Sequence, residues 1–318
     1  MISPTSYLIK LIIFKSKSVH VLEMLSFLEL TEFNNYPKGL SGIVERTVKF
    51  SRYLGYAYQF MCCLVITLYS TIPLFTKADL PIRFSHDVGK LKPAVYIFQV
   101  IGLSSAASNN SCLDVLAMSL MGICSAQIDI LNKKLITLGK NEDEDETDGS
   151  NNSYLRLKKC AKHHVEIIRF QKALERVFSS IFLAQFATSV MVICNIGFQL
   201  VHVQPASVQF ALMLFYFIAM NTQLVMYCWY GNEIIVKVYH CLSILSSAIR
   251  DACYKFEWFD SNMETKKLLL IIMEHSKKHL YLTAGKISVL SLESFTSVMR
   301  TSYSYFALLQ TLYRNNQD

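Results

Sequence analysis

A long stretch of this chain lacks charge: from Val177 to Asn232 there is no Asp, Glu, Lys or Arg. Soluble domains carry charge at about one residue in four, so a surface this apolar cannot face water. A short polar break at 202–206 divides the stretch into two apolar runs. Each run is long enough for an α-helix to cross about 30 Å of hydrocarbon. The missing charge therefore excludes a soluble domain here and predicts two membrane helices joined by a tight turn.

Charge is also scarce in the chain as a whole, since 17% of the 318 residues are charged and 52% are hydrophobic. The nine cysteines are scattered and odd in number, so neither a disulfide framework nor a zinc site is predicted. No spacing pairs a nucleophile with a base, or one carboxylate with another. We therefore expect no enzyme, no cofactor and no metal site. The net charge of +7 is expected to lie in loops at a membrane, so nucleic acid is not an expected partner.

Five segments are apolar enough, or nearly enough, to span a membrane. The first four are uncharged over nearly their whole length, whereas the last contains Glu293 and Arg300. Ionisable residues inside a span usually face the interior of a bundle or a watery pathway. The predicted spans lie near residues 53–76, 93–115, 177–201, 206–230 and 287–313. The predicted fold class is all-α, a polytopic transmembrane helix bundle.

Lysine and arginine alternate between crowded and sparse loops. Residues 10–52 hold seven of them, 77–92 four, 133–176 ten, 202–206 none and 233–286 eight. Positive charge concentrates on the cytoplasmic side of membrane proteins. We therefore predict a cytoplasmic N-terminus and, with five crossings, an extracellular C-terminus in the plasma membrane.

The predicted cytoplasmic segments contain helices of their own. Before the third span, Ile167, Phe170 and Leu174 recur at helical spacing with charged residues between them. This stripe runs directly into Val177, so we expect one helix that crosses the membrane and extends into the cytoplasm. The predicted division is a cytoplasmic segment, residues 1–52, followed by a membrane domain, residues 53–318.

The C-terminal half resembles the insect odorant receptor family. Three clusters carry the resemblance: Tyr227-Cys228-Trp229-Tyr230-Gly231-Asn232-Glu233, Tyr254 with Trp258, and Ser302-Tyr303-Ser304-Tyr305-Phe306-Ala307-Leu308-Leu309-Gln310. The match covers roughly residue 35 to the end, and a cytoplasmic N-terminus is what this family has. The family has seven spans, however, and we count five. The apolar patch Tyr7–Phe14 resembles the end of the family's second span, so the chain resembles a member that lacks the first span and most of the second.

The resemblance implies a ligand-gated, non-selective cation channel that assembles as a hetero-tetramer with an odorant co-receptor. It also implies that the last span lines the pore and that the cytoplasmic helix extensions join the subunits. In the last span, Tyr305, Leu308 and Leu312 share a helix face, with Thr311 beside them. A ring of such leucines can close a pore by excluding water. The alternative is that this face only packs on neighbouring helices.

An odorant pocket is expected in the outer half of the bundle. Its ligand would be a small, volatile, apolar molecule bound mainly by apolar burial, with one or two polar groups to orient it. Judged by depth alone, each candidate is as compatible with plain helix packing as with a ligand contact. The candidates are Ile66, Tyr69, Ser70, Tyr96, Val100, Ile193, Ile196, Met213 and Phe217.

Two other functions remain open at this point. A multi-span transporter would predict internal repeats and broken helices near the middle of the membrane. No such repeat is evident, although Pro73 and Gly197 interrupt predicted spans. The second alternative is a truncated receptor fragment that associates with partners and conducts no ions.

Overall fold

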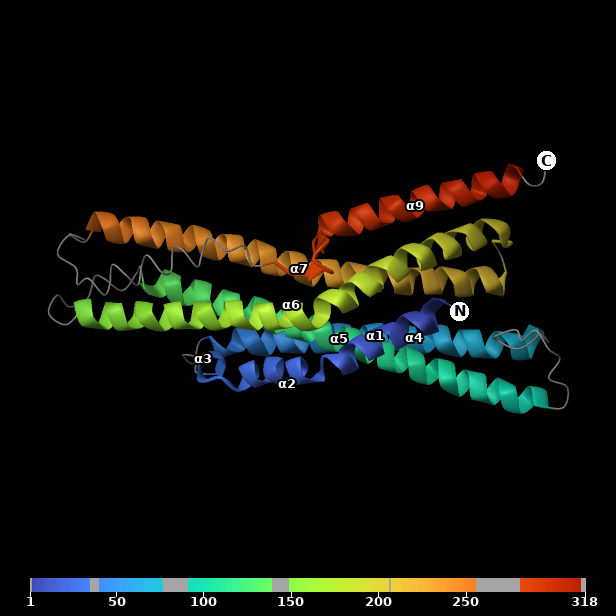
Figure 1. The fold of residues 1–318 in the computed structure, drawn as a ribbon, viewed down its shortest axis with the longest axis horizontal. Coiled ribbons are helices and arrows are strands. Elements are labelled where there is room, and N and C mark those ends of the chain that lie inside the picture. Colours follow the sequence, from blue (N-terminus) through green and yellow to red (C-terminus); the bar gives the residue numbers. More distant parts are fainter. Residues whose placement is uncertain are drawn as a thin grey trace.

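The computed structural model describes residues 2–34, 40–76, 91–138, 149–205, 207–255 and 281–315. Almost all of these residues lie in helices, and the strands in this part of the chain form one two-stranded hairpin. The structure therefore confirms the predicted all-α class (Figure 1).

Five long helices make up most of the molecule. They are α4 (Ser41–Thr76), α5 (Lys92–Leu138), α6 (Gly149–His202), α7 (Val208–Lys255) and α9 (Leu292–Asn315). At 1.5 Å per residue, the 54 residues of α6 extend for roughly 80 Å, far beyond the thickness of a bilayer core. The amphipathic stretch and the third apolar run thus form one helix, as predicted.

The long helices lie side by side along the longest axis of the molecule (Figure 1). At the right end of this view lie the end of α4, the start of α5, the junction of α6 with α7, and the C-terminus. At the left end lie the end of α5, the start of α6 and the end of α7. We call the left half of the molecule in this view, together with α2 and α3, the extension bundle.

The start of α7 is capped by Ser207. The Ser207 Oγ accepts a hydrogen bond from the Phe210 amide at 3.1 Å.

Short elements precede and follow these helices. The N-terminal ones are α1 (Ile2–Ser16), α2 (Ser18–Ser26), the 3₁₀ turn η1 (Phe27–Glu29) and α3 (Thr31–Asn34). Near the C-terminus, β1 (Thr283–Ala284) pairs with β2 (Ser288–Val289) in an antiparallel hairpin. The predicted segment 287–313 begins in this hairpin, and its helix begins only at Leu292. The difference arises because Ser288 and Val289 pair with β1. The chain reverses between the two strands at Gly285 and Lys286, which adopt positive φ.

Among the residues that the structure describes, four helices are long and apolar enough to cross a membrane, and they contain the first four predicted spans. Little of the apolar window of α4 and of α7 is buried within the chain, whereas most of that of α5 and of α6 is buried. Large exposed apolar faces are unfavourable in water and favourable in lipid. We therefore treat the right half of the molecule in Figure 1 as the membrane half.

The extension bundle has a tightly packed core that includes His163 of α6. The His163 Nε2–H donates to Gln127 Oε1 of α5 at 2.9 Å, and the ring meets Phe33 of α3 edge-on at 5.9 Å. His163 Nδ1 is buried without a hydrogen-bond partner. A proton added there would have no acceptor, and burial lowers the pKa of His163 from 6.5 to about 3. This histidine therefore stays neutral in the folded protein at neutral pH.

The buried His163 predicts a stability that falls in acid. Between pH 6.5 and 3 the unfolded chain binds a proton at His163 and the folded chain does not, so stability is complete above pH 6.5 and declines below it. The expected slope is about 1.4 kcal/mol per pH unit. The thermal midpoint of purified protein should fall from pH 6.5 to 5, and His163→Gln should reduce this fall. His20→Gln, at an exposed histidine, should leave it unchanged. Equal slopes for all three proteins would contradict the assignment.

Candidate functional site

The residues predicted to line a pore lie on an outward part of α9. Tyr305, Leu308 and Leu312 are between 52% and 54% exposed, and Thr311 is also exposed. Large side chains at this exposure are only about half covered by their own chain. Their exposure leaves these residues available to contact other subunits or a pore.

A different side of α9 packs against α6. Phe306 lies 3.7 Å from the position of a Cβ on Gly197. The Tyr313 ring stacks edge-on with Phe198 at 5.6 Å and with His202 at 4.7 Å. Ser302, one turn before Phe306, is buried. These contacts fix the rotation of α9, which the sequence could not do.

The residues predicted for the ligand pocket lie on four helices of the membrane half. Ile66, Tyr69 and Ser70 belong to α4, Tyr96 and Val100 to α5, Ile193 and Ile196 to α6, and Met213 and Phe217 to α7. The α6 pair is buried, Tyr69 is exposed, and the others are partly buried. The Tyr96 hydroxyl donates a hydrogen bond to the Ser70 carbonyl oxygen, so the α4 and α5 candidates meet.

Two cavities in the described structure lie elsewhere. One is a small space in the extension bundle, lined by residues that include His164 and Cys241. The other lies at the start of α4 and is lined by Gly42, Arg46 and neighbouring residues. Neither contains a predicted pocket residue, so the pocket assignment remains a prediction.

A buried polar cluster lies next to the predicted pocket. Lys10 of α1 donates from Nζ to Asp114 Oδ1 of α5 at 2.9 Å, and both side chains have 0% exposure. Tyr227 of α7 donates its hydroxyl to the same oxygen at 2.5 Å. Asn110 and Gln223 donate to Asp114 Oδ2. A buried charge needs this kind of pairing, because leaving it without partners in a dry interior is costly.

The polar cluster joins four helices. Lys10 Nζ also donates to Asn110 Oδ1 at 3.0 Å, and Gln185 of α6 donates to Gln223 Oε1 at 2.8 Å. Gln223 follows Phe217 by less than two helical turns, and Gln185 precedes Ile193 by about two turns. The cluster therefore forms a polar layer between the predicted pocket and the extension bundle.

Sequence reasoning missed this cluster. Lys10 falls within the apolar patch Tyr7–Phe14, and Asp114 falls near the end of the predicted span 93–115. The available signal was that two opposite charges sit within apolar segments. Such charges inside a membrane bundle tend to pair with each other. Their partnership could have been proposed, but not their shared contacts with Asn110, Gln223 and Tyr227.

The hairpin before α9 is fixed to α6. The Gly285 amide donates to the Ser179 carbonyl at 2.9 Å, and Thr283 Oγ1 donates to Glu175 Oε1 at 2.7 Å. The turn is closed by the Ile287 amide, which donates to the Ala284 carbonyl at 3.1 Å. Gly285 has φ of +62°, and a Cβ there would collide with the Leu183 side chain. These contacts hold the start of α9 against α6.

Gly231 provides the corresponding close contact with α7. A Cβ at Gly231 would lie 2.5 Å from both the Cβ and the carbonyl oxygen of Leu290. Gly231→Ala should therefore push the hairpin away from α7 and lower stability by about 1–3 kcal/mol, measured as a lower thermal midpoint. Gly102→Ala is the matched control, because no atom lies within 4 Å of its Cβ position. An equal effect of the two substitutions would show that the Gly231 contact is unimportant.

The chain is similar to known proteins in three separate comparisons: with protein families, with curated sequences and with solved structures. A family model described as 7tm Odorant receptor matches residues 2–303. Odorant receptor 46a, isoform A, of Drosophila melanogaster is 25% identical over 315 residues, which cover 95% of this chain and 78% of that receptor. Odorant receptor Or2 of Anopheles gambiae is 26% identical over 189 residues, which cover 59% of this chain and 48% of that receptor. The chain thus matches about half of the length of some curated relatives.

The fold has close counterparts among solved structures. The insect olfactory receptor OR5 from Machilis hrabei, in complex with eugenol, matches 98% of this chain and 80% of its own length. The TM-score is 0.78 at 15% sequence identity. At this identity the likeness shows a shared helical membrane fold.

Proposed function

This chain belongs to the 7tm odorant receptor family, and we propose that it acts as the odorant-binding subunit of a ligand-gated, non-selective cation channel in smell perception. The observation that carries the proposal is the extent of the likeness. The family model covers residues 2–303, and the fold of an olfactory receptor covers 98% of the chain. This likeness supports a receptor role in signal transduction and gives no support to an enzymatic role.

The chain is a multi-pass membrane protein, since four of its helices can cross a bilayer. We propose that it resides in the plasma membrane with a cytoplasmic N-terminus and an extracellular C-terminus. The distribution of Lys and Arg among the loops supports this orientation. A tag at Asp318 should then be labelled on intact cells, without permeabilisation. Labelling only after permeabilisation would reverse the orientation.

The proposed ligand is a small, volatile molecule that is mainly apolar. One related receptor was solved in complex with eugenol, a compound of this class. We place the pocket between the outer halves of α4, α5, α6 and α7. The contact of Tyr96 with Ser70 supports the part of this pocket that lies between α4 and α5.

The proposed pore helix is α9. Ionisable Glu293 and Arg300 are tolerable beside water and costly against lipid. The exposed positions Tyr305, Leu308, Thr311 and Leu312 are proposed to face the pore of a tetramer formed with co-receptor subunits. Odorant binding opens such a pore only if the pocket favours the open arrangement.

Co-expression with an odorant co-receptor, followed by current recording during an odorant screen, tests this function. The proposal expects an odorant-evoked cation current that requires this chain. Saturable uptake of a solute without such a current would favour a transporter. Current that appears only after two N-terminal spans are added would favour the fragment alternative. No current in either form would reject the proposed function.

A further inference from the structure

We propose that α4 carries a binding site for the headgroup of an anionic phospholipid, at the end of its span nearest the extension bundle. The proposal rests on the proposed membrane orientation for the leaflet involved, which would be the cytoplasmic one. The site itself is defined by the surface of α4, independently of any channel activity.

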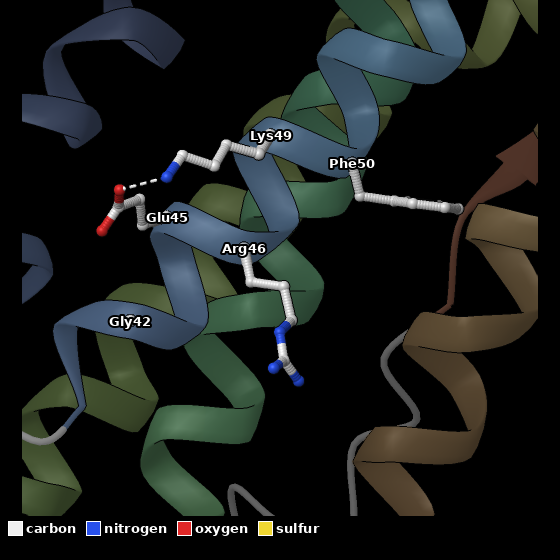
Figure 2. Close-up of a pocket in the computed structure, with 5 residues that line it drawn as sticks. All are labelled: Gly42, Glu45, Arg46, Lys49 and Phe50. Carbon is white, nitrogen blue, oxygen red and sulfur yellow. Dashed lines mark ion pairs between the residues drawn. The ribbon is translucent and has the colours of Figure 1, made fainter.

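A cavity of about 420 Å³ lies against the first turns of α4 and is lined by Gly42, Glu45, Arg46, Lys49 and Phe50. Figure 2 shows Glu45 and Lys49 pointing to one side of the helix and Arg46 and Phe50 to the other. No neighbouring atom lies within 4 Å of a Cβ position on Gly42. The groove is therefore open beside Gly42.

The charged side chains in this groove differ in whether another side chain of the described structure already pairs with them. Lys49 Nζ lies 2.6 Å from Glu45 Oε1, so that these two charges compensate each other. Arg46 makes no ion pair with any residue that the structure describes. A free guanidinium can donate two parallel hydrogen bonds to a phosphate. The nearby Arg52 adds a second positive charge close to Arg46, so the groove fits a phosphate-bearing group.

An apolar stripe continues from the groove along the same face of α4. Phe50, Tyr53, Tyr56 and Phe60 recur at helical spacing and are each more than 50% exposed. The opposite face is occupied by protein: Ser51 Oγ is hydrogen-bonded to the Tyr230 hydroxyl at 3.0 Å. Rotation of α4 is thus fixed with the aromatic stripe outward. Basic residues that precede an aromatic stripe complement a phospholipid, which joins an anionic headgroup to apolar chains.

The position of the groove selects a lipid over a free phosphate. Arg46, Lys49 and Arg52 lie within two turns of Tyr53, where the uncharged run begins. Basic side chains at this level of a span attract anionic lipids, each by a factor of roughly five in affinity. A free phosphate would contact the arginine and leave the aromatic stripe unused.

The test is a titration of the purified full chain, in a neutral detergent, with dioctanoyl phosphatidylserine. Binding is counted as adducts by native mass spectrometry. The double variant Arg46→Gln/Lys49→Gln should bind roughly 30-fold more weakly. The matched control is Lys133→Gln/Lys172→Gln, which removes the same charge from exposed positions on α5 and α6, and it should bind as the wild type does. Size-exclusion chromatography checks that both variants are folded.

Two further arms separate a lipid site from adsorption of phosphate. Glycerophosphoserine, which has the headgroup without the acyl chains, should bind at least tenfold more weakly than the lipid. Tyr53→Ala/Tyr56→Ala should weaken lipid binding and leave glycerophosphoserine binding unchanged. The proposal is overturned if the two double-glutamine variants behave alike, or if glycerophosphoserine binds as tightly as the lipid. Neither measurement depends on ion current. A failure of the lipid-site proposal can therefore be distinguished from a failure of the proposed channel function.

Discussion

Lys10→Met is expected to be the most destabilising single substitution in the membrane half. It would leave Asp114, which has 0% exposure, as a buried carboxylate without a cation. Breaking a buried ion pair by removing one partner costs about 3–5 kcal/mol. Hydrogen bonds from Tyr227, Asn110 and Gln223 would retain part of the stabilisation, so a loss of about 3 kcal/mol is expected. The measurements are the thermal midpoint and the monodisperse fraction on size-exclusion chromatography.

The double variant Lys10→Met/Asp114→Asn provides the decisive comparison. Neutral replacements for both partners leave no buried charge, and the new amide can still accept from Tyr227. The double variant should therefore be more stable than Lys10→Met alone, with a coupling energy of about 2–3 kcal/mol. Lys15→Met is the control, because Lys15 is an exposed lysine on the same helix. If Lys10→Met were no worse than Lys15→Met, the pair would not hold α1 in the bundle.

The helices were predictable because their cause is local. Lipid leaves no solvent to satisfy the backbone, so an uncharged run of sufficient length must be helical. The stripe of Ile167, Phe170 and Leu174 predicted that α6 continues beyond the membrane, and the structure confirms it. The start of α9 was harder to predict. The pattern 287–313 reads as one apolar segment, and only the contacts of Gly285 and Gly231 explain why its first residues form a hairpin.

The residues of the functional site were harder to predict from the sequence, because a site depends on how each helix is rotated about its axis. Depth along a span can be read from the sequence, and depth placed the pocket candidates on four helices of one half. Which face of each helix is free depends on tertiary packing. The structure fixes this for α9, where Phe306 and Tyr313 pack on α6, and for α4, where Ser51 contacts Tyr230. Lys10 and Asp114 are 104 positions apart, so their pairing required the fold itself.

The proposed gate gives the second large expected effect. If Leu308 lines a pore that closes by excluding water, Leu308→Ser should let water and ions remain in the closed channel. Co-expressed with the co-receptor, this variant should carry a standing current without odorant, with the ratio of open to closed channels raised roughly tenfold, equivalent to about 1.4 kcal/mol. Leu312→Ser, one turn further along α9, should act in the same direction, because both leucines are similarly exposed.

Leu309→Ser is the matched control for this experiment. It makes the same chemical change at the adjacent position. Successive residues of a helix are rotated by about 100°, so Leu309 lies nearer the side of α9 on which Phe306 and Tyr313 contact α6. A helix that only packs on its neighbours would respond to any of the three substitutions with reduced surface expression and no standing current. If α9 lines the pore, the three substitutions should differ: Leu308→Ser and Leu312→Ser should change the resting current, and Leu309→Ser should not. A standing current from Leu309→Ser, or its absence from both of the others, would place the pore on a different face of α9.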